Sequence, residues 1–214
     1  MIQTILIYAI PILLAITLHE AAHAFAARYF GDTTAYMEGR MTLNPIKHVD
    51  PIGTILIPLV LFVLSSPILF GYAKPVPVNY GRLRNPRRHS AFVAFAGPLS
   101  NLLMALMWMI IKFVIIKIGI QEAFFLRMTD AGFTFNLMLF AFNLFPLPPM
   151  DGGRIVTSIL PPKTAYRFAQ IEPYGMYIVL ALAFLKVLNY WMIPVMEIAR
   201  TVLLTLLHPL SLLL

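Results

Sequence analysis

The chain has 214 residues and no cysteine, which excludes disulfides and zinc sites built on thiolates. Charged residues are also scarce, at 12% against about a quarter in an average soluble domain. Hydrophobic residues make up 60% and gather in several long runs with few charges, which is typical of helical proteins that cross a membrane repeatedly. We therefore predict an all-α, polytopic membrane protein in which any metal ion is held by histidine, aspartate or glutamate.

The net charge of +7 would suit nucleic-acid binding if it belonged to a soluble domain. Here the basic residues flank apolar segments, where the positive-inside rule expects them, so we predict no nucleic-acid partner. Met1 to Leu18 contains no basic residue, and the apolar run continues past Ala27. This pattern favours a retained membrane helix over a signal peptide.

The apolar runs predict about five to six hydrophobic segments. They are Ile2 to Phe30, Ile52 to Phe70, Ala91 to Ile118, Ala131 to Phe145, about Tyr174 to Leu188 and Ile193 to Leu212. The first would be roughly 43 Å long as a helix, which exceeds a hydrocarbon core of about 30 Å. Gly119 to Asp130 is expected to be a connector and Asn189 to Trp191 an interfacial turn, and Met37 to Leu43 could be a short strand.

Two histidines and a glutamate interrupt the first apolar segment, as His19-Glu20-Ala21-Ala22-His23. Residues four apart share one face of a helix, so both imidazoles can reach one ion. A catalytic zinc ion takes three protein ligands and a water, and Glu20 is placed to act on that water as a general base. Such costly groups in an apolar span usually mark function; the alternative is a polar cluster that packs against other helices.

Asp151 is the best candidate for a third ligand, because it follows three prolines and precedes Gly152 and Gly153. Prolines break the helix, and the glycines allow backbone conformations closed to other residues. Broken backbone at membrane depth is tolerated where it is buried or lines a cavity, which suits a carboxylate ligand. The alternative is an ordinary turn in which Asp151 caps the following helix.

Five segments, in order along the first three-quarters of the chain, resemble one family. They are His19-Glu20-x-x-His23-Ala24, Asn44 to Thr54, Phe70 to Asn79, Ala96 to Asn101 and Asn143 to Gly153. Together they resemble the site-2 protease family of intramembrane zinc metalloproteases. That family hydrolyses peptide bonds in or near transmembrane segments of its substrates, as in regulated intramembrane proteolysis.

The resemblance implies one Zn²⁺ ion held by His19, His23 and Asp151, with Glu20 as the general base. Asn143 corresponds to the family's asparagine upstream of the aspartate. Its implied role is to polarise the substrate carbonyl or help to place the oxyanion, although an amide in an apolar helix could equally make a packing hydrogen bond.

We expect a single membrane-embedded metalloprotease domain over residues 1–214. Its core, residues 1–157, would contain a three-helix zinc-binding unit with short extended or re-entrant segments, followed by a C-terminal helical hairpin at about 174–212. Gly97 with Asn101 is expected to permit a close helix contact. The PDZ and nucleotide-sensing domains of some family members do not fit, which predicts a short form whose partners are a transmembrane protein substrate and the lipid bilayer.

A shared zinc site requires that both ligand-bearing segments reach the same depth, so their helices should run in the same direction. Ala91 to Ile118 supplies the single crossing between them, and Ile52 to Phe70 should therefore enter and return, or lie shallowly, rather than span. This arrangement also leaves the basic loop Gly71 to Ser90 in the cytosol. We expect an integral, multi-pass protein of a prokaryotic cell membrane, with its N-terminus outside and its zinc site nearer the cytosolic face.

Within the basic loop, Ala73 to Asn79 must be extended, because each proline disfavours helix at the residue before it. This segment could pair with substrate as an added strand, or it could be a rigid linker. Two other functions remain open. A divalent-metal transporter would need acidic residues and histidines spread along several helices, and an inactive homologue acting as a binding module would have no need of Glu20.

Overall fold

In a computed structural model, the structure describes residues 2–57, 60, 71 and 73–213, and this part of the chain is helical with no β-strand. The all-α prediction is therefore confirmed for these residues. The longer helices are α1 (Ile2–Tyr29), α4 (Pro86–Lys117), α5 (Ala123–Asn143), α6 (Asp151–Ile159), α7 (Pro162–Ala169), α8 (Glu172–Phe184) and α9 (Asn189–Leu213). The short helical turns are α2 (Thr34–Met37), η1 (Pro45–Lys47), η2 (Pro51–Leu56) and η3 (Tyr80–Arg82).

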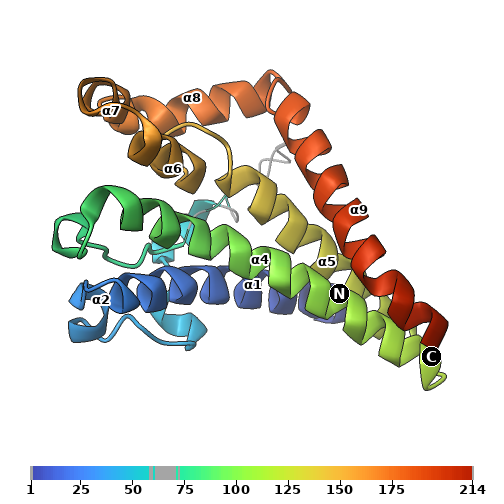
Figure 1. Cartoon of the computed structure of the whole chain (residues 1–214). Coiled ribbons are helices and arrows are strands. Elements are labelled where there is room, and N and C mark those ends of the chain that lie inside the picture. The colour runs from blue at the N-terminus through green and yellow to red at the C-terminus, as the bar shows by residue number, and fades with distance from the viewer. Residues whose placement is uncertain (1, 58–59, 61–70, 72, 214) are drawn as a thin grey trace.

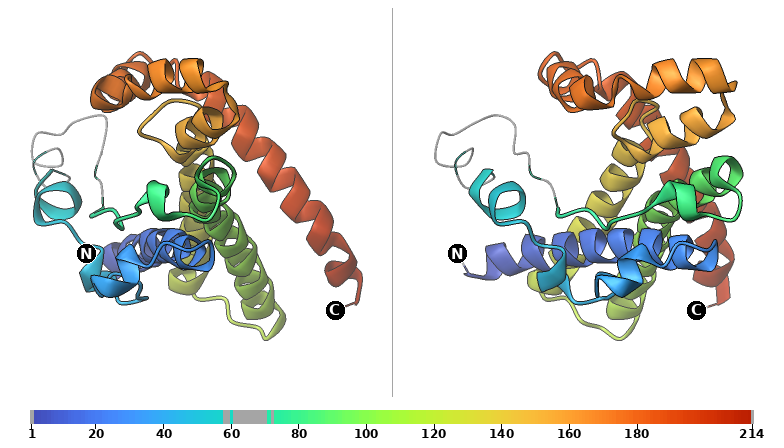
Figure 2. Two further views of the ribbon diagram at one scale, coloured as in Figure 1. Left: turned by 60° about the vertical axis from the view of Figure 1, so that its left-hand side comes forward. Right: turned by 90° about the vertical axis from the view of Figure 1, so that its left-hand side faces the viewer.

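The centre of the molecule is formed by α1, α4 and α5, each of which packs against the other two. Helices α4 and α5 run antiparallel, and α1 crosses them obliquely (Figures 1 and 2). Helix α9 packs on α5 through a cluster that includes Leu137, Ala199 and Leu203. Helices α6, α7 and α8 lie together on one side of α4 and α5 (Figure 1).

Three helices of the described chain are long and apolar enough to cross a membrane. They are α1, α4 and the Asn189–His208 part of α9. Large apolar side chains such as Ile5, Leu103 and Ile198 are more than half exposed on these helices, as expected for surfaces that face lipid rather than water.

Helix α5 begins at Ala123, so the prediction of a connector over Gly119 to Asp130 is wrong from Ala123 onward. Lys112 Nζ on α4 lies 2.6 Å from Asp130 Oδ1 on α5, and this ion pair joins the two helices near their turn. The turn itself is short and centres on Gly119, whose φ of 82° is accessible to glycine at little cost.

The short strand suggested for Met37 to Leu43 is absent from the structure. Met37 ends α2, and Gly39 follows in a left-handed conformation with φ of 64°. The next two backbone N–H groups, of Arg40 and Met41, both donate to the Ala35 carbonyl. A helix-ending turn thus uses the donors that a strand would have offered to a neighbour.

Most of the segment Ile52 to Phe70 lies outside the described residues, and so does the prediction that it re-enters the membrane. Its start is the helical turn η2, which Asp50 caps by accepting hydrogen bonds from the N–H groups of Ile52 and Gly53. The segment Ala73 to Asn79 carries no helix, as its prolines require, and it passes over α1 as unwound chain (Figure 2).

The interfacial turn expected at Asn189 to Trp191 is instead the first turn of α9. The chain reverses just before it, where Lys186 adopts a φ of 59°. The Trp191 indole N–H then donates to the Ala141 carbonyl at 2.9 Å, and this hydrogen bond joins the start of α9 to the end of α5.

Candidate metal centre

His19 and His23 lie one turn apart on the face of α1 that packs against α4. Both side chains are buried, with 7% and 8% of their surface exposed. Neutral imidazoles in an apolar interface need polar partners, so the identity of those partners decides what the two rings can do.

The Nε2 atoms of both histidines lie close to Gly97 of α4. A Cβ added at Gly97 would overlap His23 Nε2 and would lie 2.6 Å from His19 Nε2. Any side chain at this position would therefore displace both imidazoles. The close helix contact predicted at Gly97 is a contact with the two histidines themselves.

The Nδ1 atoms of both rings face hydrogen-bond acceptors on α4. His19 Nδ1 lies 2.6 Å from Asn101 Oδ1, and His23 Nδ1 lies 2.8 Å from the Val93 carbonyl. Since these oxygens accept, each Nδ1 carries the proton and donates. Each Nε2 consequently keeps its lone pair, which is the tautomer that a metal requires.

Asp151 faces the two Nε2 atoms from the first residue of α6, and Met150 rather than Asp151 occupies the N-cap position. The side chain of Asp151 is 13% exposed. Its Oδ2 lies 3.2 Å from His19 Nε2 and 3.3 Å from His23 Nε2. The structure thus brings together the three residues that the sequence nominated as ligands, across about 130 positions of chain.

The two glycines after Asp151 serve a different purpose from the one expected. Neither has a positive φ, and both lie in helix α6. A Cβ at Gly152 would meet the Phe145 carbonyl oxygen at 2.5 Å, and one at Gly153 would meet the Leu147 carbonyl oxygen at 2.7 Å. Their lack of a side chain lets the start of α6 press against the loop that precedes it, which fixes the position of Asp151.

The three atoms form a triangle suited to zinc. Its third side, between the two Nε2 atoms of His19 and His23, is 3.0 Å. Ligands on bonds of about 2.0–2.1 Å in a regular tetrahedron lie about 3.3–3.4 Å apart, close to these distances. Asp151 Oδ2 is buried and has no hydrogen-bond partner among the described residues, so a cation would satisfy it. The donor set of two imidazoles and one carboxylate fits zinc and leaves a fourth position open.

Electrostatics favour the ionised form of Asp151. Burial raises the pKa of this carboxyl, but the positive charge of His23 when its ring is protonated and the hydrogen bonds from both rings outweigh burial and hold the pKa below its ordinary value; a cation bound between the three residues would supply positive charge at the same place. Asp151 is therefore an anion at neutral pH, as a metal ligand must be.

Glu20 lies beside His19 on α1, and its carboxylate reaches the unwound segment 73–79. Its Oε2 accepts a hydrogen bond of 2.7 Å from the backbone N–H of Val76. Two further backbone amides of this segment are fixed, since Lys74 donates to the His48 carbonyl and Asn79 donates to Asp32. The segment is thus tied down next to the carboxylate expected to act as general base.

Asn143 is the last residue of α5 and is partly buried. Its Nδ2 donates to the Leu139 carbonyl one turn earlier, at 3.0 Å. The structure records no hydrogen bond or ion pair between Asn143 and the three candidate ligands, all of which lie in its described part.

The sequence did not single out Asn136, which is completely buried on α5 and hydrogen-bonded to Asn101. Asn101 entered the sequence analysis only as the end of a family-like segment and as part of a helix contact. A polar amide in an otherwise apolar helix is the signal that could have drawn attention to both residues.

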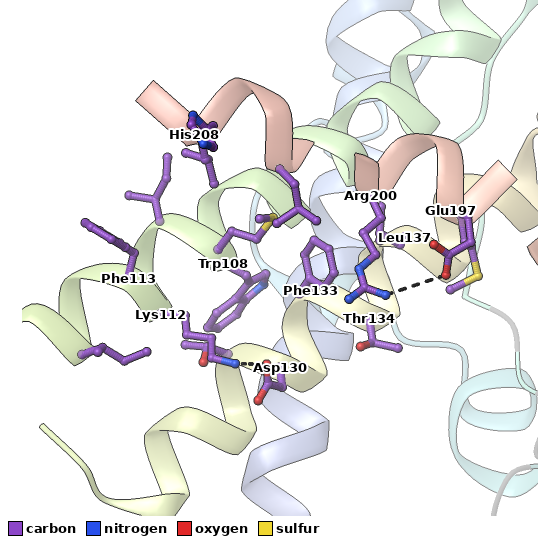
Figure 3. A pocket seen from close by; sticks show the side chains of 17 residues that line it. Trp108, Lys112, Phe113, Asp130, Phe133, Thr134, Leu137, Glu197, Arg200 and His208 are labelled. Carbon is purple, nitrogen blue, oxygen red and sulfur yellow. Dashed lines mark hydrogen bonds and ion pairs between the residues drawn. The ribbon is translucent and has the colours of Figure 1, made fainter. Parts of the chain in front are cut away.

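A cavity of about 820 Å³ lies elsewhere, between α4, α5 and α9 (Figure 3). Trp108, Phe133 and Leu137 line it, and the ion pairs Lys112–Asp130 and Glu197–Arg200 border it (Figure 3). None of the three candidate metal ligands lines this cavity. The chemistry of the site is therefore located by its convergent donor atoms and not by the size of a pocket.

Comparison with known proteins agrees with this geometry. Residues 119–186 match the model of peptidase family M50. The chain is 39% identical over 196 residues to the "Putative zinc metalloprotease YwhC" of Bacillus subtilis (strain 168), covering 89% of this chain and 86% of that protein. It is 28% identical over 187 residues to the "Putative zinc metalloprotease Rip2" of Mycolicibacterium smegmatis, covering 84% of this chain and 67% of that protein. No solved structure gives a significant match.

Proposed function

The chain belongs to peptidase family M50, the site-2 protease family of zinc metalloproteases, and from this premise we propose that it hydrolyses peptide bonds within or near transmembrane segments of other proteins. Members of this family are integral membrane proteins, in agreement with the three candidate spans of this chain. We propose that residues 1–214 act as a single catalytic domain, with a core of residues 1–157 and the helices of about 174–212 attached to it.

The observation that carries the proposal is the convergence of His19, His23 and Asp151 beside Glu20. The three ligand atoms lie 3.0 to 3.3 Å apart, and both imidazoles present unprotonated nitrogens toward the carboxylate. A purely structural cluster would have no need to leave Asp151 Oδ2 without a hydrogen bond.

When bound, zinc supplies a Lewis acid that polarises a carbonyl and lowers the pKa of a water toward about 7. The Glu20 carboxylate would accept the proton of the attacking water and pass it to the leaving amine. In the absence of substrate, the backbone N–H of Val76 donates a hydrogen bond to this carboxylate and orients it. Asn143 retains a second amide hydrogen beside the one given to Leu139, and this hydrogen can be donated to a substrate carbonyl.

We further propose that the zinc site lies nearer the cytosolic face, with the N-terminus outside. His23 is about one and a half turns from the end of α1, where Arg28 lies. Arg84 donates a hydrogen bond to the Tyr29 carbonyl at this end of α1, and Arg82, Arg87 and Arg88 are its neighbours in sequence. Basic loops of membrane proteins remain in the cytosol.

A divalent-metal transporter is the competing function. Such a protein needs ionisable groups along a path through the membrane. Among the described residues, the one group of three or more histidines and acids able to share an ion is His19, His23 and Asp151. A single closed cluster beside a general base favours hydrolysis.

The test is cleavage of a single-span protein in liposomes that contain the full chain. We expect fragments whose new ends, placed by mass spectrometry, lie in or near the hydrophobic segment. Removal of metal by a chelator should abolish cleavage, and added zinc should restore it. Cleavage that is indifferent to metal removal would contradict the proposal, as would zinc flux into the liposomes without any proteolysis.

A further inference from the structure

Two asparagines are buried completely in the interface of three apolar helices. Asn101 lies on α4 and Asn136 on α5, and neither has any exposed surface. A buried amide must satisfy two donors and an acceptor, and failure to do so is costly in an apolar setting. Their hydrogen bonds therefore define their orientation.

The hydrogen bonds of Asn101 leave a single orientation of its amide. Its Nδ2 donates to the Ala15 carbonyl at 3.2 Å and to Asn136 Oδ1 at 3.1 Å. Both donors are thus used on other groups, and Oδ1 must face His19, 2.6 Å from Nδ1. Reversing the amide would set Nδ2 against a donor and Oδ1 against two acceptors.

Asn136 fixes the direction of the next hydrogen bond in the series that begins at His19. Its own Nδ2 donates to the Gly132 carbonyl at 2.8 Å, which commits its Oδ1 to accept from Asn101. All the donors therefore point away from the metal centre, from His19 to Asn101, from Asn101 to Asn136, and from Asn136 to the backbone of α5. The direction of these hydrogen bonds requires a proton on His19 Nδ1, so the neutral ring carries its lone pair on Nε2.

We propose that Asn101 is a positioning residue for the metal ligand His19, and that Asn136 orients Asn101 for this task. The inference rests on the proposed function, because it assumes that His19 binds zinc. Asn101 hydrogen-bonds to α1, which carries the two histidines, and to α5, which leads to Asp151. It therefore sets the tautomer of His19 and helps to set the distance between the histidines and Asp151.

A role in helix packing alone makes a different prediction from a role in metal binding. Loss of any buried amide should lower the stability of the fold, whereas loss of a ligand-orienting partner should also weaken zinc binding, by about 10- to 100-fold. Thr129 provides the matched control. It is equally buried on α5, and its hydroxyl bonds the Leu126 carbonyl of its own helix, outside the chain of amides.

The experiment measures the zinc affinity of the full chain in detergent micelles by competition with a chromophoric chelator. Asn101→Ala should bind zinc about 10- to 100-fold more weakly than the unsubstituted protein, and Thr129→Val should bind it unchanged. Asn101→Asp keeps an acceptor for the Nδ1 proton but loses the two hydrogen bonds that Nδ2 donates, so its zinc affinity should fall less than that of Asn101→Ala. The visible spectrum of bound Co²⁺ should change in Asn101→Ala and be retained in Asn101→Asp.

Unchanged zinc affinity in Asn101→Ala, or an equal loss in Thr129→Val, would overturn the proposal. If Asn101→Ala does not fold, Asn101→Asp decides the matter: a loss of zinc affinity of 100-fold or more there, with the fold intact by circular dichroism, would also overturn the proposal. Failure of the unsubstituted protein to bind zinc would instead remove the proposed function and this inference together, so the two failures are distinguishable.

Discussion

The backbone N–H of Val76 donates a 2.7 Å hydrogen bond to Glu20 Oε2, across 56 positions of sequence. This bond joins the candidate general base to the unwound segment 73–79. The flanking prolines have no N–H of their own, so Val76 is the residue between them that can make such a bond.

We expect Val76→Pro to lower kcat by about tenfold or more with little change in KM, because it removes the donor that orients the Glu20 carboxylate. Zinc content should be unaffected. Val76→Ala is the control, since it loses similar packing against Ala24 and Ala35 but keeps the N–H. Equal kcat values for the two variants would show that the amide does not position Glu20.

Gly97→Ala should abolish stoichiometric zinc binding, because the new Cβ would overlap the Nε2 atoms of His19 and His23. Gly39→Ala strains a left-handed turn outside the centre, where φ is 64°, and should lower stability while leaving the zinc content at one per chain. Zinc is measured by mass spectrometry on purified protein. A Gly97→Ala protein that still carries one zinc ion would contradict the geometry of the centre.

Asp151→Asn should weaken zinc binding by at least tenfold, since it replaces the anionic ligand with a neutral amide. Asp130→Asn is the control, because Asp130 pairs with Lys112 outside the centre and should leave zinc affinity unchanged. Chelator competition measures both. Indistinguishable affinities would remove Asp151 from the set of ligands.

Arg87 binds the far end of the helix that begins with Asp151. Its guanidinium donates to the carbonyls of Ser158, Ile159 and Leu160 at 2.8 to 3.0 Å, where α6 ends. Arg87→Ala should destabilise the protein by about 1 kcal/mol, because these carbonyls lose a cationic cap.

The corresponding measurement is thermal unfolding, with hydrogen exchange of the α6 amides as a local probe. Arg88→Ala is the control, since the Arg88 guanidinium lies over Phe92 and makes none of the three hydrogen bonds of Arg87. Exchange in α6 that is equally fast in the two variants would show that Arg87 does not fasten this helix.

Local patterns were enough to predict the first half of the site. His19 and His23 share a face because a helix repeats every 3.6 residues, and their setting in an apolar run marks them as functional. The second half of the site is Asp151, and it was harder to predict because His19 and His23 lie far from it in sequence. Only the resemblance to a family and the broken backbone around Asp151 could connect the two halves before the structure did.

The supporting residues could not be predicted in the same way. Whether Asn101 and Asn136 meet depends on the register of α4 against α5, which no periodicity within one helix specifies. The glycines after Asp151 were given a conformational role, but the close approach of the loop at 144–149 explains them better.

The most direct test of the account compares the unsubstituted protein with Glu20→Gln in liposomes that contain a single-span substrate. Glutamine keeps the size of glutamate and can still meet the Val76 amide, but it cannot take a proton. We predict one zinc ion per chain in both proteins and cleavage by the unsubstituted protein alone. Equal cleavage by Glu20→Gln would contradict the account.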